Sequence, residues 1–263
     1  MHPILVSTGA LTITAHGTLL SLGVLAGAGF TLAQAHREHL MLGPTIDVLL
    51  AALVGGMIGA RLGYVWIHWP YFADHLDEVW RFWLGGLAWH GGLIGGASGA
   101  AILSRYRLRQ PALVWLDRLA PGAALATVFG WLGCWLAACG YGREMFPGDA
   151  IFSIAVDSPD TYGVWAPRLP SQWLGAAWGL SVFLALWRLC GTQRLRPGAR
   201  FAAFVGLYSF GSWLVGFTRG DFASPTGAGN IEHAIDAFLF CLGTLATSIA
   251  LMRPPRLSSE LRL

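Results

Sequence analysis

Long apolar runs alternate with short polar segments along the whole chain, and the length of these runs is typical of membrane-spanning helices. A spanning helix needs about 20 mostly apolar residues, because the hydrocarbon layer is about 30 Å thick and each residue rises about 1.5 Å. Windows of this kind run from Ala10 to Gln34, Thr45 to Ile67, Leu84 to Leu103, Ala112 to Gly140, Gln172 to Leu189, Arg200 to Thr218 and Ile231 to Met252. We therefore predict an all-α fold: a polytopic membrane bundle of about seven transmembrane helices, forming a single domain over residues 1–263.

Arginines are distributed unequally between the two alternating sets of loops, which predicts the orientation of the chain. One set holds Arg37, Arg105, Arg107, Arg109, Arg188, Arg194, Arg196, Arg200, Arg253, Arg256 and Arg262. The opposite set holds only Arg81, Arg143, Arg168 and Arg219, together with several acidic residues. Cytoplasmic loops retain positive charge during insertion, so we expect the N-terminus outside and the C-terminus in the cytoplasm.

Composition agrees with a membrane location and narrows the choice of partners. Of the 263 residues, 55% are apolar and only 12% are charged, whereas a soluble domain has roughly a quarter of its residues charged. The net charge of +3 is small, and no basic stripe with interleaved aromatic residues occurs, so we expect no nucleic-acid partner. The N-terminus lacks the basic region and cleavage site of a signal peptide, and we expect the first helix to be retained as a span.

One segment between the predicted spans is long and polar. Residues 141–171 contain proline, aspartate, glycine and several aromatic residues, and this composition is too polar to cross the bilayer. With the predicted orientation, the segment forms an external loop or a small cap.

Unusual polar residues gather near the outward ends of the predicted helices. Arg61 lies near the end of the second helix and His90 at the start of the third, while Arg168, Gln172 and Arg219 flank the fifth and sixth. Charged residues within or beside a span are energetically expensive, so they usually face a bundle interior, a partner or water. We infer a polar chamber that opens outward.

Structural roles remain open for each of these residues. Arg61 follows a glycine-rich helix face and is also compatible with hydrogen bonding to loop carbonyls. A lone histidine such as His90 often only satisfies a helix end, and arginines such as Arg168 and Arg219 often reach lipid headgroups. Acids at the start of the last helix favour its dipole, so a structural role is preferred for the polar group Glu232, His233 and Asp236.

Several motifs resemble those of the prolipoprotein diacylglyceryl transferases of the bacterial inner membrane. The stretch GARLGYV from Gly59 to Val65 is similar to the second-helix motif of that family, and WHGGLIGG from Trp89 to Gly96 resembles its histidine signature. The longest family signature is similar to Gly130 to Gly142, and the next segment to Asp160 to Gln172. Tyr208 and Arg219 also fall at matching positions, so the resemblance extends over most of the chain.

The resemblance implies transfer of a diacylglyceryl group from phosphatidylglycerol to the lipobox cysteine of a prolipoprotein, with release of glycerol phosphate. The partners would be phosphatidylglycerol, a signal peptide with its lipobox cysteine and the surrounding membrane lipid, and no metal or other cofactor is required. His90 would accept the thiol proton and the arginines would bind phosphate. The implied catalytic residues are His90, Arg61 and Tyr208; the implied substrate-binding residues are Arg168, Arg219, Gly91, Gly92, Gly142 and Gln172.

The sequence departs from the family pattern at several positions. Arginine is expected where Trp131 and Ser212 stand; the other departures are His16, Cys134, Cys139 and Gly216 in place of tyrosine, asparagine, glutamate and glutamate. Three hypotheses follow: a divergent transferase of the same reaction class, a paralogue with another lipid donor or acceptor, and a non-enzymatic protein that binds lipid or a partner. The four cysteines lack the paired spacing of a zinc site, and Cys134 and Cys139 are compatible with a structural role, a disulfide or a reactive thiol.

Overall fold

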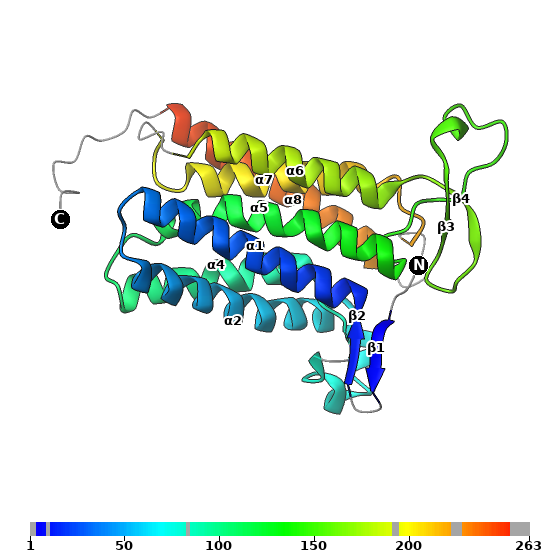
Figure 1. Ribbon diagram of the computed structural model, residues 1–263, viewed down its shortest axis with the longest axis horizontal. Coiled ribbons are helices and arrows are strands. Elements are labelled where there is room, and N and C mark those ends of the chain that lie inside the picture. The colour runs from blue at the N-terminus through cyan, green and yellow to red at the C-terminus, as the bar shows by residue number, and fades with distance from the viewer. Residues whose placement is uncertain (1–3, 9–10, 83–84, 191–194, 222–227, 253–263) are drawn as a thin grey trace.

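Seven long helices lie side by side in the computed structural model, which describes residues 4–8, 11–82, 85–190, 195–221 and 228–252 (Figure 1). Their bounds are α1 Ala15–Arg37, α2 Leu42–Ile67, α4 Trp89–Tyr106, α5 Ala112–Ala137, α6 Ser171–Arg188, α7 Ala199–Gly216 and α8 Ala228–Met252. A short helix, α3 (Trp69–Phe72), and the 3-10 turn η1 (Leu76–Glu78) follow α2. The chain is thus mostly helical, as its apolar runs predict.

The N-terminal region corrects the predicted start of the first helix. Strand β1 (Ile4–Thr8) pairs antiparallel with β2 (Leu11–Thr14), and α1 begins at Ala15 rather than at Ala10. β-branched residues over Thr12 to Thr14 favour a strand, and the side chain of Thr14 then caps the helix by accepting a hydrogen bond of 3.1 Å from the backbone N–H of Gly17.

The segment after α5 also contains strands, so the fold is not purely helical. Within residues 141–171 lie the 3-10 turn η3 (Phe152–Ile154) and an antiparallel pair formed by β3 (Val156–Pro159) and β4 (Trp165–Arg168). The backbone around Gly142 pairs with the backbone around Arg219, which joins this segment to the end of α7.

Glycines allow the closest helix contacts of the bundle. Helix α2 packs along α4, where Gly55 and Gly59 face Gly91, Gly95 and Gly99. A Cβ atom at Gly59 or Gly95 would collide with backbone atoms of the opposite helix, so only glycine permits this separation. The contact between α2 and α4 therefore fixes the N-terminus of α4, with His90, relative to α2.

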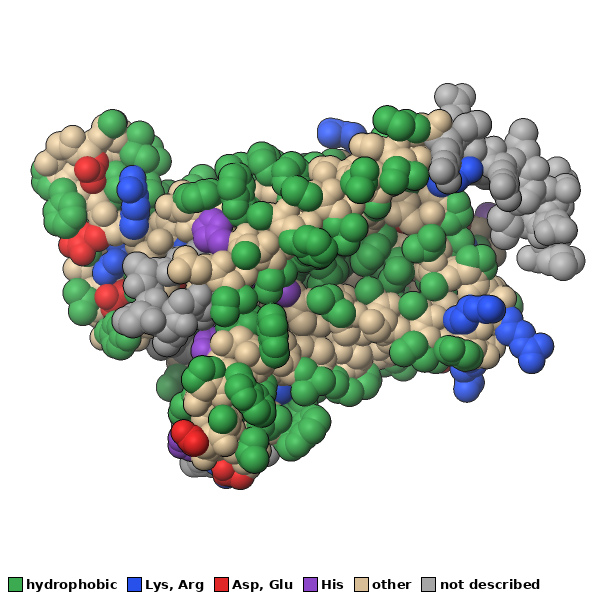
Figure 2. All heavy atoms as spheres, turned by 180° about the vertical axis from the view of Figure 1, so that it is seen from behind, with side chains coloured by type: hydrophobic (Ala, Val, Ile, Leu, Met, Phe, Trp, Pro, Cys, Tyr) green, Lys and Arg blue, Asp and Glu red, His purple; other side chains and the backbone are tan. Residues whose placement is uncertain are grey.

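The chain is a multi-pass membrane protein. Four of its described helices are long and apolar enough to span a bilayer: Ala15–Arg37, Leu42–Ile67, Ala112–Ala137 and Gly229–Met252. Helices α4, α6 and α7 have 18 residues each. On the face seen in Figure 2, apolar side chains cover most of the middle of the bundle and charged ones lie mainly toward its two ends. Both strand pairs lie at one end, and the last turn of α8 lies at the other (Figure 1).

Candidate active site

A buried histidine–aspartate pair joins two helices that are far apart in the sequence. His90, in the first turn of α4, places Nε2 at 3.0 Å from Oδ1 of Asp236 in α8. The two side chains are 4% and 2% exposed. The hydroxyl of Ser212, in α7, donates a 2.7 Å hydrogen bond to the other carboxylate oxygen of Asp236. Both oxygens are therefore engaged, and the carboxylate is fixed against the imidazole.

The second nitrogen of His90 is available for chemistry. Its Nδ1 is buried and has no hydrogen-bond partner among the described residues. An ionised carboxylate only accepts hydrogen bonds, so the contact with Asp236 calls for a proton on Nε2, and in that neutral tautomer Nδ1 presents a lone pair. This arrangement is that of a general base with its orienting group.

Tyr208 lies in the same cluster as His90. Its hydroxyl accepts a 3.1 Å hydrogen bond from Nε1 of Trp131, and its ring meets that of Trp89 edge to face with centroids 4.8 Å apart. The Trp89 and His90 rings are also in contact, with centroids 4.4 Å apart. The structure thus brings together His90 and Tyr208, two of the three residues expected to be catalytic. Trp131 itself packs against Gly175 of α6.

Arg219 lies at the outer edge of this cluster, between α7 and α8. Its guanidinium donates to both carboxylate oxygens of Asp221, at 2.9 and 2.7 Å, and approaches Glu232 at 3.8 Å. Gly140 stands between Arg219 and Trp131: a Cβ atom there would lie 4.0 Å from Nε of Arg219 and 3.3 Å from the Trp131 ring. Only Gly140 therefore separates Arg219 from Trp131, the residue that donates a hydrogen bond to Tyr208.

Arg168 and Gln172 secure the polypeptide around the end of α5. Arg168 pairs with Asp160 at 3.2 Å and its guanidinium lies over the Tyr141 ring at 5.0 Å. Its buried Nε has no hydrogen-bond partner among the described residues. Burial raises the pKa of Tyr141, as do the nearby carboxylates, although Arg168 opposes them. The amide of Gln172 donates to the carbonyl of Cys139 at 3.2 Å.

Gly142 is a point of close backbone approach in this region. Its Cβ position is occupied by the carbonyl of Leu169, so no larger residue fits without displacement. The backbone N–H of Gly220 donates to the carbonyl of Tyr141 at 2.8 Å, which keeps the 141–143 segment beside Arg219.

Arg61 is the third residue expected to be catalytic, and it points to a different loop. Its guanidinium donates to four backbone carbonyls, those of Glu78 at 2.5 Å, Val79 at 2.8 Å, Gly85 at 2.6 Å and Gly86 at 3.2 Å. The side chain is buried and also lies 5.2 Å from the Phe72 ring. These contacts match the structural role considered for Arg61, because they hold the segment that leads into α4.

Gly91 and Gly92 lie on the helix face that packs against α2. Gly91 meets the backbone of Gly59 and Gly63, while Gly92 faces Ala60 and Gly56 at ordinary contact distances. Their visible role is helix packing, and their expected contact with substrate stays a prediction.

Sequence reasoning missed Asp236, the partner of His90, and Ser212, which donates to Asp236. Asp236 was assigned a helix-dipole role, and Ser212 was noted only as a departure from the family pattern. One signal did exist: Asp236 is an acid inside a long apolar run, where an unpaired charge is costly.

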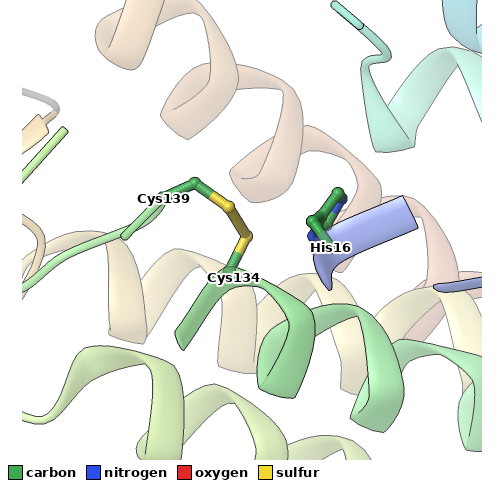
Figure 3. A group of neighbouring side chains, drawn as sticks. All are labelled: His16, Cys134 and Cys139. Atoms are coloured by element: carbon green, nitrogen blue, oxygen red, sulfur yellow. A yellow bond between two sulfur atoms is a disulfide. The ribbon is translucent and has the colours of Figure 1, made fainter. Parts of the chain in front are cut away.

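A second polar group lies at the same end of the bundle. Cys134 and Cys139 form a disulfide, and His16 of α1 stands beside it (Figure 3). One side-chain atom from each of the three residues lies within 4.8 Å of the others.

The fold and the site define a multi-pass membrane protein with a buried, oriented histidine near one end of its helices. The chain belongs to the prolipoprotein diacylglyceryl transferase family, because the family model matches residues 3–252.

Curated relatives agree with this assignment. A phosphatidylglycerol–prolipoprotein diacylglyceryl transferase of Symbiobacterium thermophilum is 27% identical over 276 residues, which covers 97% of this chain and 94% of the relative. A protein of the same name from Trichormus variabilis is 29% identical over 220 residues, covering 81% and 78%. One from Lactobacillus delbrueckii is 37% identical over 130 residues. This last match covers 49% of the chain and spans about half, 47%, of the Lactobacillus protein.

Proposed function

We propose that the chain transfers a diacylglyceryl group from phosphatidylglycerol to the lipobox cysteine of a prolipoprotein. Membership of the family supports this reaction class. The observation that carries the proposal is the state of His90: Asp236 holds one nitrogen, and the other is buried with no hydrogen-bond partner in the part of the chain that the structure describes. A thiol becomes a strong nucleophile only when deprotonated, and a positioned imidazole supplies that step.

The reaction requires one proton transfer and one displacement. Nδ1 of His90 accepts the thiol proton, and the resulting imidazolium is stabilised by Asp236. The thiolate then attacks the glyceryl carbon that carries the phosphate ester, so a C–S bond forms and a C–O bond breaks. The electron pair of that bond stays on the phosphate oxygen, and glycerol phosphate leaves.

The leaving phosphate needs cationic donors, and Arg219 is the best-placed candidate. It lies beside Gly140, which also adjoins Trp131, the hydrogen-bond partner of Tyr208, and its present partners are carboxylates that a phosphate group can replace as hydrogen-bond acceptors. We assign Arg168 and Gln172 to the walls of the substrate site. Arg61 acts in this proposal by holding the backbone at residues 78–79 and 85–86, just before α4.

The proposal includes the arrangement in the membrane. All seven long helices span the bacterial inner membrane, with β1 outside, the end of α8 in the cytoplasm and residues 141–171 forming an outer cap on a single domain. The unequal distribution of arginines supports this orientation. Labelling of a single cysteine introduced between Arg105 and Arg109 tests it: reaction with an impermeant maleimide in intact cells contradicts the orientation.

A second candidate is transfer with another lipid donor or to another acceptor. The specific observation in its favour is Trp131, which stands where the resemblance predicts an arginine. Its indole packs on Gly175 and donates to Tyr208, so this position offers no cation to a phosphate. A donor with a less charged leaving group has less need of that contact.

Purified protein, phosphatidylglycerol vesicles and a lipobox peptide test the two candidates. We expect a peptide mass increase that matches one diacylglyceryl group, together with release of glycerol phosphate. His90→Gln lowers the rate of both signals by about 10²- to 10⁴-fold, whereas His36→Gln, in the last turn of α1 and away from His90, leaves them unchanged. Absence of transfer by the folded wild-type protein, together with failure to replace the native transferase in depleted cells, eliminates the first candidate and leaves the second.

A further inference from the structure

Three side chains with redox or proton chemistry meet outside the cluster around His90. His16 lies in the first turn of α1, Cys134 in the last turn of α5 and Cys139 just after that helix ends (Figure 3). The cysteines are joined by a disulfide, and Nδ1 of His16 is buried without a hydrogen-bond partner among the described residues. An imidazole with a free nitrogen thus stands beside an oxidised cysteine pair.

Packing between α1 and α5 holds the imidazole in this place. Gly133 lies directly under His16: a Cβ atom there would be 3.0 Å from Nδ1 and 3.2 Å from the backbone of His16. Because residue 133 is glycine, the first turn of α1 can rest on the last turn of α5. The position of His16 relative to the two sulfur atoms is therefore set by backbone contact.

The disulfide is not required to close the turn that it crosses. The N–H of Cys139 already donates to the carbonyl of Cys134 at 3.0 Å, and Ala138 adopts a left-handed conformation (φ 59°) that ends the helix. Cross-links across loops this short are expected to restrict the unfolded chain least. Both cysteines are also partly exposed, so a thiol can reach them.

We propose that Cys134 and Cys139 form a thiol–disulfide exchange centre that accepts two electrons from a dithiol substrate, with His16 as its proton partner. This activity does not depend on lipid transfer. It would operate at the end of the bundle that carries the strand pairs, and an outward location of that end agrees with the oxidising conditions under which disulfides persist.

The exchange balances without a further reactant. A thiolate of the substrate attacks one sulfur of the pair, the S–S bond breaks, and the other sulfur leaves as a thiolate that takes a proton through His16. The second substrate thiol then attacks the mixed disulfide and releases the remaining cysteine. Two electrons and two protons have moved from the substrate to the pair, and the substrate is left as a disulfide.

Reduction of the full-length protein by dithiothreitol tests the proposal. Cys190 and Cys241, the free cysteines among the described residues, are first replaced by Ser, and thiols are counted by alkylation and mass spectrometry. We expect the folded chain in detergent to react about tenfold or more faster than the same chain unfolded in guanidinium. His16→Gln slows both reduction and reoxidation by about tenfold or more, in line with general acid–base catalysis. His36→Gln is the matched control and leaves the rates unchanged.

An equilibrium measurement separates this role from a structural one. In glutathione buffers, His16→Gln shifts the equilibrium between disulfide and dithiol by less than about twofold, because a proton partner accelerates both directions equally. A pair that resists dithiothreitol until the chain unfolds is a structural cross-link and overturns the proposal. Equal rates in wild type and His16→Gln also overturn it, and so does zinc binding by a reduced pair that shows no exchange.

Discussion

Replacement of Asp236 by Asn isolates the contribution of the carboxylate that orients His90. The amide keeps the shape of the side chain, and its oxygen still accepts from Nε2 at the 3.0 Å distance seen for Asp236. A hydrogen bond to a charged group contributes about 1.5–3 kcal/mol and a neutral one about 0.5–1.5 kcal/mol, so the difference is about 1–2 kcal/mol. At about 1.4 kcal/mol per tenfold, kcat falls roughly 5- to 30-fold.

The assay is transfer of a diacylglyceryl group to a lipobox peptide, with the KM for phosphatidylglycerol measured alongside kcat. His90→Gln removes the base itself and lowers kcat by about 10²- to 10⁴-fold. Asp47→Asn, at an exposed site near the opposite end of the bundle, is the control and leaves both constants unchanged. Wild-type kcat in Asp236→Asn, with His90→Gln inactive, refutes the role assigned to the carboxylate.

Three further predictions concern Gly142 in the segment after α5, the proposed phosphate contact of Arg219 and the thiol of Cys190. Gly142→Ala forces a methyl group against a backbone carbonyl and lowers stability by about 1–3 kcal/mol, seen as a reduced Tm, whereas Gly29→Ala, in open space, does not. Asp221→Asn weakens the competitor for Arg219, so the KM for phosphatidylglycerol falls; an increase contradicts phosphate binding by Arg219. Burial raises the pKa of Cys190, so less of its thiol is deprotonated at pH 8. Its alkylation rate, measured by peptide mass spectrometry, is therefore below that of glutathione at pH 8 and rises steeply toward pH 10.

The helices were predictable because their signal is local. A run of about 20 apolar residues identifies a spanning helix without any knowledge of its neighbours. The predicted start of α1 is wrong for the same reason: Leu11–Thr14 continues the run without a charged residue, and hydropathy does not reveal its pairing with the strand Ile4–Thr8. The glycines of α2 and α4 indicated close approach, and the structure shows which helix each one meets.

The chemistry of the site was only partly predictable because it depends on helix rotation. His90 and Asp236 are 146 residues apart, and neither the polar first half of α8 nor the start of α4 carries a local signal that says which helix it will meet. Arg61 shows the opposite case. The sequence left two roles open for this arginine, contact with a substrate or hydrogen bonding to loop carbonyls. In the structure its guanidinium donates to four backbone carbonyls.

The contact of Ser212 with Asp236 gives this residue a role that the sequence did not indicate. From the sequence alone it is a missing cation, because the resemblance predicts arginine there. In the structure its hydroxyl donates to Asp236 at 2.7 Å. An arginine at this position would form an ion pair with the same buried carboxylate and compete with His90 for it. In the mechanism that we propose, serine leaves the carboxylate of Asp236 to orient the imidazole of His90, and Arg219 takes over the phosphate contact.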